Sequence, residues 1–351
     1  MKALIAMSGG VDSSVAACLM QEAGFSCSGA IMLLCTPQIP GCQATATEDA
    51  RDVAARLGMP FYTFDCSEAF RREVVDHFVA TYEKGGTPNP CIECNRHLKF
   101  GAFLELALEM GFDRIATGHY ARISQDPQTG RYLLSQPADL AKDQTYFLYS
   151  LTQHQLAHTC FPLGELTKDA VRQIAEAKSL RNAKKRDSQD ICFIPGGDYM
   201  DFIRSYTGKD YPSGSFLDKD GKVVGSHTGA VSYTIGQRKG LGLAMGAPVY
   251  VCSKDMAANT VTVGSNEDLM RTTLLAQNWN WITLDKLREP IRVNAKVRYR
   301  HTAQPATVYP ESDGTARVVF DEPQRAITAG QAVVLYNGGY VVGGGTITEV
   351  L

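Results

Sequence analysis

Three cysteines stand in segments whose residue types suit thiol chemistry. Cys91 and Cys94 form a CxxC pair within residues 87–95 (TPNPCIECN). The prolines and the lack of apolar periodicity predict an irregular loop there, exposed or lining a cavity. Cys192 follows the basic run 184–186 (KKR). Positive charge nearby lowers a thiol pKa and raises the thiolate fraction, which is the form that a nucleophile or a sulfur carrier needs.

The CxxC pair also has plainer explanations, namely half of a zinc knuckle or two incidental thiols. A structural zinc site takes four ligands, and the sequence has no second CxxC to complete one. Cys35 and Cys42 flank a Pro/Gly loop, and their role stays open. The remaining cysteines fall in apolar or strand-like segments and are predicted to be core: Cys18, Cys27, Cys66, Cys160 and Cys252.

Residues 8–13 (SGGVDS) lie between a short apolar stretch and a helical pattern. This context places a glycine turn at a helix N-terminus, where backbone N–H groups and the helix dipole attract anions. The serine hydroxyls are donors, and Asp12 is an acceptor for Mg²⁺ or for the helix cap. The segment is neither a Walker loop nor a GxGxxG turn. A capped turn without a ligand is the alternative, and the tight pattern in this context disfavours it.

Two further segments fit the same nucleotide site. Residues 117–120 (TGHY) close a predicted strand at its carboxyl end, the edge where open α/β sheets bind ligands. Met32, on another predicted strand, could pack against adenine. A structural turn explains the first equally well, and a core position is the commoner role for a methionine.

The elements that must position these residues alternate between strand and helix. Apolar runs predict strands at 3–7, 29–34, 61–64 and 114–117, and apolar stripes predict helices near 13–23, 50–57, 67–82 and 100–108, with Ser67 as a cap. Such alternation indicates a parallel sheet covered on both faces. Beyond residue 210, short β-rich stretches separated by Gly, Asp and Asn turns replace the helical pattern. We therefore predict an α/β domain over 1–207, a small central β-rich domain over 208–264 and a C-terminal β-barrel-like domain over 265–351.

Composition and charge describe an ordinary globular protein. The 351 residues are 44% hydrophobic and 21% charged, and the net charge is −2, so contacts with nucleic acid have to come from local patches. We find no apolar run of membrane-spanning length and no secretory signal. We therefore expect a cytoplasmic protein with no membrane partner, whose ten cysteines serve as reduced thiols, metal ligands or redox groups.

The motifs together resemble one family. SGGVDS is similar to the pyrophosphate loop of the ATP pyrophosphatases, which split ATP between its α and β phosphates to adenylate an acceptor. Over nearly the whole chain the sequence resembles the tRNA-specific 2-thiouridylases of that group, which place sulfur on the wobble uridine of tRNA. The matching blocks, in order, are SGGVDS, TPNP followed by CN, ATGHY, KDQTYFLY, FPLGELTK, AKKRDSQDICFI, TIGQRKGLG and KVRYRH.

The resemblance implies roles for individual residues. It makes Cys94 the catalytic nucleophile and Cys192 the carrier of a persulfide, with ATP and Mg²⁺ as cofactors and a cysteine desulfurase or a sulfur-relay protein as sulfur donor. ATP would be held by Ala6, Met7, Ser8, Gly9, Gly10, Val11, Asp12, Ser13, Met32 and Gly118. The tRNA would contact Asn89, Pro90, Cys91, His119, Lys142, Asp143, Gln144, Arg298, Tyr299 and Gln331. Basic residues that would hold the splayed anticodon are Arg238, Lys239 and Arg300, although each basic pair taken alone is typical of a solvated face.

Cys91 departs from the pattern of the best-known bacterial members, which carry Asp at its position. Three cysteines are also the ligand set that leaves one iron of a [4Fe-4S] cluster open for an extra sulfur. Two mechanisms follow. Either Cys91, Cys94 and Cys192 hold a cluster that presents hydrosulfide, or Cys192 carries a persulfide that Cys94 resolves. We lean towards the cluster, because a soft thiolate ligand has replaced the aspartate.

Two other hypotheses stay open. A different ATP pyrophosphatase, such as an amide or argininosuccinate synthetase, would act on a small molecule and would not need a CxxC pair plus a distant cysteine. A non-catalytic RNA-binding protein could keep a degenerate nucleotide fold, and the intact SGGVDS segment argues against it.

Overall fold

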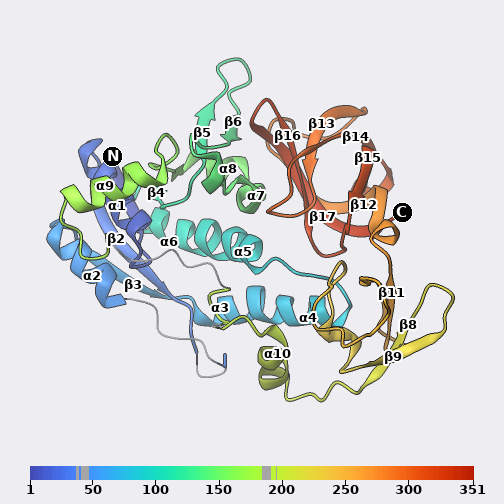
Figure 1. Cartoon of the computed structure of the whole chain (residues 1–351). Coiled ribbons are helices and arrows are strands. Elements are labelled where there is room, and N and C mark those ends of the chain that lie inside the picture. The colour runs from blue at the N-terminus through green and yellow to red at the C-terminus, as the bar shows by residue number, and fades with distance from the viewer. Residues whose placement is uncertain (37–38, 41–46, 184–190, 195) are drawn as a thin grey trace.

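The structure is a computed structural model of the chain. It describes residues 1–36, 39–40, 47–183, 191–194 and 196–351. The basic run 184–186 and Cys42 therefore lie outside the described residues. Three domains follow one another along the chain, as the sequence predicted (Figure 1).

The first domain is built on a parallel sheet with the strand order β3-β2-β1-β4-β7. Its strands are β1 (Lys2–Ala6), β2 (Ser26–Leu33), β3 (Phe61–Asp65), β4 (Arg114–Ala116) and β7 (Thr159–Cys160). Alternate residues of β1 point to opposite faces. Ala3 and Ile5 join the core under α1 (Val11–Glu22), α2 (Thr47–Arg56) and α9 (Lys168–Ala177), whereas Leu4 joins the core formed with α6 (Phe103–Glu109). The sequence analysis missed β7, because two residues carry no periodicity.

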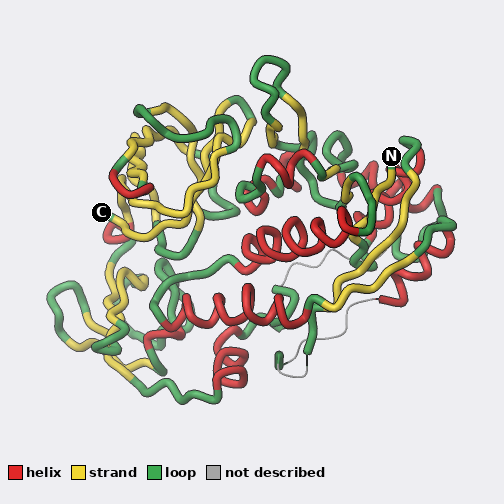
Figure 2. Tube along the Cα trace, turned by 180° about the vertical axis from the view of Figure 1, so that it is seen from behind, coloured by secondary structure: helices red, strands yellow, loops and turns green. Residues whose placement is uncertain are grey.

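Two long helical segments run side by side between the sheet and the other domains (Figures 1 and 2). One consists of α3 (Ser67–Phe70), the π-helix η1 (Arg71–Asp76) and α4 (His77–Glu83). The other consists of α5 (Pro90–Glu93), the π-helix η2 (Cys94–Ala102) and α6. The predicted cap is wrong by one residue, because Cys66 is the N-cap of α3 and the Asp65 carboxylate accepts hydrogen bonds from Ser67.

The prediction of an irregular loop around Cys91 is wrong as well. Asn89 is the N-cap of α5 and Pro90 its first residue, so the fixed φ of proline starts the helix instead of breaking it. Cys91 therefore lies in α5, and Cys94 is the first residue of η2.

The other two domains are β structures. The central domain pairs β8 (Gly214–Leu217), β9 (Val223–His227), β10 (Tyr250–Asp255) and β11 (Thr260–Gly264) in the order β10-β11-β8-β9, after α10 (Tyr199–Thr207). The C-terminal domain is a closed six-stranded barrel in the order β12-β15-β14-β13-β16-β17, closed by pairing of β17 with β12. Its strands are β12 (Met270–Trp281), β13 (Ile291–Lys296), β14 (Gln304–Pro310), β15 (Ala316–Arg325), β16 (Ala332–Asn337) and β17 (Tyr340–Val350). These domains confirm the predicted fold class.

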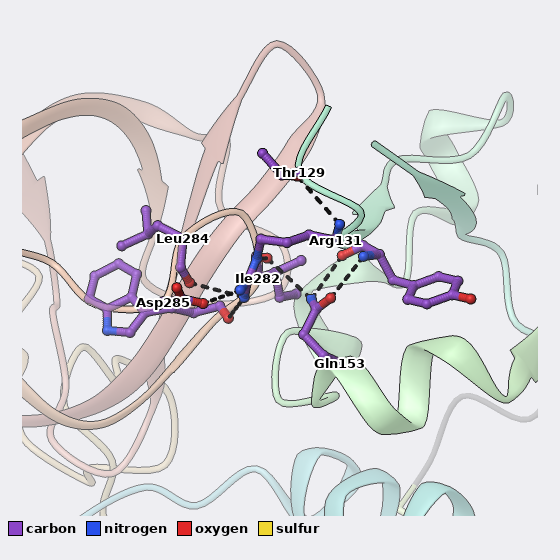
Figure 3. Close-up of polar contacts among 8 residues, drawn as sticks. Thr129, Arg131, Gln153, Ile282, Leu284 and Asp285 are labelled. Carbon is purple, nitrogen blue, oxygen red and sulfur yellow. Dashed lines mark hydrogen bonds and ion pairs between the residues drawn. The ribbon is translucent and has the colours of Figure 1, made fainter. Parts of the chain in front are cut away.

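A hairpin of the first domain joins it to the barrel. The strands β5 (Arg122–Gln125) and β6 (Tyr132–Ser135) extend the barrel sheet, with Ser135 paired to Tyr340. The Arg131 guanidinium donates hydrogen bonds to the carbonyls of Trp281, Ile282 and Leu284 and pairs with Asp285 (Figure 3). Gln153, the first residue of α8 (Gln153–Ala157), also donates to the Ile282 carbonyl at 3.2 Å. Short helices α7 (Thr145–Leu148) and η3 (Leu140–Lys142) complete this junction.

None of the helices described in the chain is long and apolar enough to cross a membrane.

Candidate active site

The glycine-serine turn joins β1 to α1 at the carboxyl edge of the parallel sheet, as predicted. Gly9 has φ +68°, a conformation that glycine adopts at no steric cost, whereas Gly10 is extended with φ −91°. Only the first of the two glycines therefore needs the left-handed region. The Ser13 hydroxyl donates to the Gly10 carbonyl at 3.1 Å and accepts from the Ser8 backbone N–H at 3.2 Å, which folds the turn back over the first turn of α1.

Asp12 lies in the first turn of α1 and is paired with a lysine that the sequence analysis did not single out. The Lys168 ammonium donates to both carboxylate oxygens, at 2.7 and 2.8 Å, and the Tyr120 hydroxyl donates to one of them at 3.0 Å. Lys168 begins α9, and its side chain is only 9% exposed. Lys168 is the last residue of the FPLGELTK block. The motif could therefore have drawn attention to this lysine, but the sequence gives no sign that it pairs with Asp12.

Gly118 is packed directly on the start of α1. A Cβ at this position would lie 2.7 Å from the carbonyl carbon of Asp12 and 2.7 Å from the backbone nitrogen of Ser13. Glycine is required here because two stretches of main chain approach each other closely. The close approach brings residues 117–120 beside the glycine-serine turn.

Asn182 is a second residue that the sequence analysis missed. Its amide Nδ2 donates to the Gly9 carbonyl at 3.1 Å and to the Ser14 hydroxyl at 2.9 Å. The side chain is buried, and its Oδ1 has no hydrogen-bond partner in the structure. Asn182 therefore stabilises the glycine-serine turn, and it belongs to the segment that precedes Cys192 in the sequence.

The three cysteines lie in one neighbourhood although they come from two distant segments. Cys94 is buried, whereas Cys91 and Cys192 are solvent-exposed. Desolvation by the surrounding protein atoms and, to a smaller extent, the neighbouring thiols of Cys94 and Cys91 raise the pKa of the Cys192 thiol to about 12, although part of the residue is exposed. Burial also raises the pKa of Cys94 and of Cys91. The three sulfur atoms therefore lie close enough to interact electrostatically, and the roles predicted for them stay predictions.

Lys99 is the cation that acts on all three thiols, and it lowers the pKa of each. In a π-helix the N–H of residue i+5 bonds to the carbonyl of residue i, so Lys99 lies one turn beyond Cys94 within η2. The expectation of a lowered thiol pKa is wrong, because desolvation outweighs this single charge. The run 184–186, to which that expectation assigned the charge, lies outside the described residues.

His119 connects the two halves of the site. Burial lowers the pKa of its imidazole well below the ordinary value, and the Lys99 charge lowers it further. The ring is therefore neutral at physiological pH, with Nδ1 at 2.7 Å from the Thr117 hydroxyl. Gly118 packs on Asp12 while the next residue, His119, lies within electrostatic reach of Lys99, so the turn and the cysteines are on neighbouring parts of the domain.

Cys192 is held in place by the phenylalanine after it. Phe193 is completely buried and makes edge-on ring contacts with Phe70, Phe78 and Phe202, at centroid distances of 5.6, 5.4 and 5.1 Å. Cys94 belongs to the same buried cluster. One apolar core therefore anchors both Cys94 and the segment that carries Cys192.

The other cysteines fit the core prediction in part. Cys18, Cys27 and Cys66 are buried. Cys160 and Cys252 are partly exposed, and Cys252 lines a cavity of about 340 Å³ between the domains. Cys160, at the end of the edge strand β7, is packed against the core but not fully enclosed by it, whereas the prediction is wrong for Cys252, which faces the junction of the domains.

The side chains that were considered as ligands of an iron–sulfur cluster or of Mg²⁺ are not arranged to bind either one. Among the residues that the structure describes, no group of three or more His, Cys, Asp or Glu side chains is arranged to hold a metal ion. Cys91, Cys94 and Cys192 as placed therefore do not fit the ligand set of a [4Fe-4S] cluster. The Asp12 carboxylate does not fit a Mg²⁺ ligand either, because Lys168 occupies both of its oxygens.

Several residues expected to contact tRNA are engaged inside the protein. Asp143 is buried and accepts hydrogen bonds from Gln136 at 2.8 Å and from the Thr145 hydroxyl at 2.6 Å. Gln144 accepts from the Tyr120 backbone N–H at 2.8 Å, and Gln331 donates to the Thr87 carbonyl at 2.8 Å. These side chains support the neighbouring elements.

Other predicted tRNA contacts lie at the surface. Arg298 is half-buried and donates to the Arg325 carbonyl at 2.8 Å, and the Tyr299 ring lies 4.3 Å from that of Phe147. Three further basic residues are exposed, namely Arg238, Lys239 and Arg300. Exposed cations on both β domains are available for a polyanion.

The whole chain matches models of known protein families. Residues 1–196 match the tRNA methyl transferase HUP domain, residues 200–265 the tRNA methyl transferase PRC-barrel domain, and residues 271–347 the aminomethyltransferase beta-barrel domain. The boundaries that we predicted, 207/208 and 264/265, stay predictions.

Relatives match over almost the full length. The chain is 47% identical to the tRNA-specific 2-thiouridylase MnmA of Clostridioides difficile, over 100% of this chain and 99% of that protein. It is 51% identical to the tRNA-specific 2-thiouridylase MnmA of Moorella thermoacetica, over 99% of each chain. Among solved structures, a 4-thiouridine synthetase–RNA complex with bound ATP is 17% identical with a TM-score of 0.36, covering 59% of this chain and 50% of that one. On the sequence relatives and the family models, this chain belongs to the family of the tRNA-specific 2-thiouridylases, the tRNA sulfurtransferases that its motifs resemble.

Proposed function

We propose that this chain thiolates carbon 2 of the wobble uridine of tRNA in two steps, consuming ATP in the first and transferring a sulfur atom in the second. The observation that supports the proposal is that Cys91, Cys94 and Cys192 lie within electrostatic reach of one another in the same domain as the glycine-serine turn. A nucleotide site alone would suit many acceptors. A nucleotide site connected to a cluster of thiols suits sulfur transfer.

The first step activates the base. The uracil O2 atom attacks the α-phosphorus of ATP, the O2–P bond forms, the bond between the α-phosphorus and the bridging oxygen breaks, and pyrophosphate leaves. The N-terminus of α1 and the hydroxyls of Ser8 and Ser13 face the turn where the departing charge develops. Lys168, held beside this turn by Asp12, supplies a positive charge at the same position.

The second step replaces oxygen by sulfur. The terminal sulfur of a persulfide on Cys192 attacks carbon 2, the carbon–oxygen bond breaks, and AMP leaves with its electron pair. The Cys94 thiolate then attacks the Cys192 sulfur, so that the thiouridine departs with the transferred sulfur and a Cys94–Cys192 disulfide remains. A thiol reductant reduces this disulfide, and a sulfur-donor protein such as a cysteine desulfurase reloads Cys192.

The positions of Cys91 and Lys99 favour a supporting role for both. Lys99 lowers the pKa of each thiol and so raises the thiolate fraction that the second step consumes. Cys91 is exposed and three residues before Cys94, which supports a position beside the entering base. The cluster mechanism, in which Cys91 would be a ligand, stays the alternative that experiment must decide.

Recognition of tRNA is proposed to be local and electrostatic. The exposed cations Arg238, Lys239 and Arg300 would hold the phosphate backbone, while Asn89 and His119 would contact the splayed base, with the buried Pro90 holding the start of α5.

The decisive experiment combines anaerobic purification with single cysteine substitutions. We expect Cys94→Ala and Cys192→Ala each to abolish thiolated tRNA, and Cys91→Ala to keep most of the activity with no iron bound. Cys252→Ala, which removes another partly exposed thiol, is the matched control and should behave as wild type.

Each other result has a definite meaning. Iron and sulfide that bind to the wild type and are lost with activity in Cys91→Ala would establish the cluster mechanism in place of the persulfide. Activity retained by Cys94→Ala would refute both. If a small acceptor drives pyrophosphate release and tRNA does not affect the rate, the chain is another ATP pyrophosphatase. If no pyrophosphate is released under any condition, the chain is a non-catalytic RNA-binding protein.

A further inference from the structure

The barrel holds the segment that leads into the cysteine pair. The Gln331 side-chain amide donates to the carbonyls of Thr87 and Pro88, at 2.8 and 3.3 Å. The Thr87 backbone N–H in turn donates to the Ala329 carbonyl at 3.0 Å. Both acceptors of the Gln331 amide are carbonyl oxygens, so its NH₂ group has to face them.

In this contact two stretches of main chain, residues 86–88 and 329–331, lie directly against each other, and we call this contact the seam. Gly330 has φ +88°, and a Cβ there would lie 3.0 Å from the Thr87 nitrogen and 3.1 Å from the Thr87 oxygen. From the other side, a Cβ on Gly86 would lie 3.3 Å from the Ala329 oxygen. Neither stretch can move towards the other, and Gln331 prevents them from separating.

The barrel side of the seam is firmly anchored. The Gln331 carbonyl accepts from the Ile347 N–H at 2.8 Å, and the Gly330 N–H donates to the Ile347 carbonyl at 2.9 Å. Ile347 is buried in the barrel core. The side chain of Gln331 is therefore fixed to a rigid element.

The other side of the seam continues directly into the site. Thr87 and Pro88 precede Asn89, the N-cap of α5, and α5 carries Cys91 and leads into Cys94. A shift of Pro88 has only two residues in which to be absorbed before it reaches Cys91.

We propose that Gln331 is a positioning residue that fixes the start of α5, and through it Cys91 and Cys94, rather than a residue that reads tRNA. The proposal rests on the sulfur-transfer function proposed above, and it assigns the barrel a part in setting the geometry of the thiols before tRNA arrives.

The test is Gln331→Glu, which keeps the size of the side chain and turns two attractive contacts with carbonyl oxygens into repulsive ones. We measure alkylation of Cys91 and Cys94 by iodoacetamide, resolved by mass spectrometry, together with tRNA affinity and the kcat and KM of thiolation. Gln277→Glu, an exposed glutamine of the same barrel that bonds to the Thr315 side chain, is the matched control. Gly330→Ala disturbs the same seam from the backbone and is the second variant, should Gln331→Glu not fold.

We expect Gln331→Glu and Gly330→Ala to speed alkylation of Cys94 about tenfold without tRNA, the effect of losing one or two hydrogen bonds that oppose local opening. The kcat should fall by a similar factor, while KM and Kd for tRNA stay within about twofold. Weaker tRNA binding with unchanged alkylation would overturn the proposal and make Gln331 a tRNA contact. Unchanged alkylation in a folded Gly330→Ala protein would also overturn it. Because alkylation needs no turnover, a wild type that fails to thiolate tRNA would refute the proposed function and leave this test intact.

Discussion

Replacing Gly118 by alanine tests whether the nucleotide site depends on the close approach of residues 117–120 to α1. The added Cβ would lie 2.7 Å from two backbone atoms, one in Asp12 and one in Ser13. Carbon atoms in ordinary contact are about 3.5 Å apart or more, so the two segments have to separate by roughly 0.8 Å. The clash is with main chain and not with a flexible side chain, and it therefore cannot be relieved by a rotamer change.

The size of the effect follows from the cost of overpacking. Inserting a methyl group into a close-packed site costs about 1–3 kcal/mol. If the free protein relaxes by moving the first turn of α1 away, ATP binding has to restore that turn, and the cost then appears in the affinity. A loss of 1–3 kcal/mol weakens ATP binding by about 5- to 150-fold. Affinity for tRNA should not change, because Gly118 lies at the nucleotide end of the site.

The assay is calorimetric titration with ATP, together with urea unfolding of each variant. Ile347→Val in the barrel core controls for a general loss of stability, since it costs about 0.5–1.5 kcal/mol far from the turn. A folded Gly118→Ala protein that binds ATP with wild-type affinity would refute the reasoning. Equal weakening in Ile347→Val would show that the effect reports stability and not the turn.

Four further predictions concern charged groups. Lys168→Met removes the cation paired with Asp12 and should slow tRNA-dependent pyrophosphate release by ~100-fold; release at the wild-type rate would contradict a role for this lysine. Alkylation of Cys192 should become about tenfold faster per pH unit between pH 7 and 10, because the pKa of its thiol is about 12 and only the thiolate reacts. Lys99→Met should slow this alkylation throughout that range, since it removes the charge that lowers the pKa, and a flat pH profile would exclude the thiolate as the reacting form. Arg300→Glu should weaken tRNA binding and reduce its salt slope by about one or more, with ATP affinity unchanged; an unaltered slope would remove this residue from the interface.

The sequence by itself determined the features that depend on neighbours along the chain. The turn after β1, the alternation of strands and helices and the change to β structure near residue 210 all follow from local periodicity and turn residues. The family could also be identified, because several specific blocks occur in one order. Periodicity, turn residues and short motifs each involve only a few consecutive residues, so they can be recognised without knowledge of the fold.

Only the tertiary structure decided which distant groups meet. Lys168 pairs with Asp12 across 156 residues, and Asn182 reaches Gly9 across 173. Gln331, which the family resemblance assigned to tRNA, is bonded to backbone carbonyls near the cysteines. Backbone carbonyls are present at every position and leave no mark on the residue types that accept such bonds.

The state of the thiols was decided in the same way. A basic run in the sequence predicted a lowered pKa for Cys192, yet desolvation raises it, and the cation that lowers it is Lys99 of η2, which is distant in the sequence. Local charge can be counted from the sequence, whereas desolvation depends on how many protein atoms the whole fold places around one sulfur.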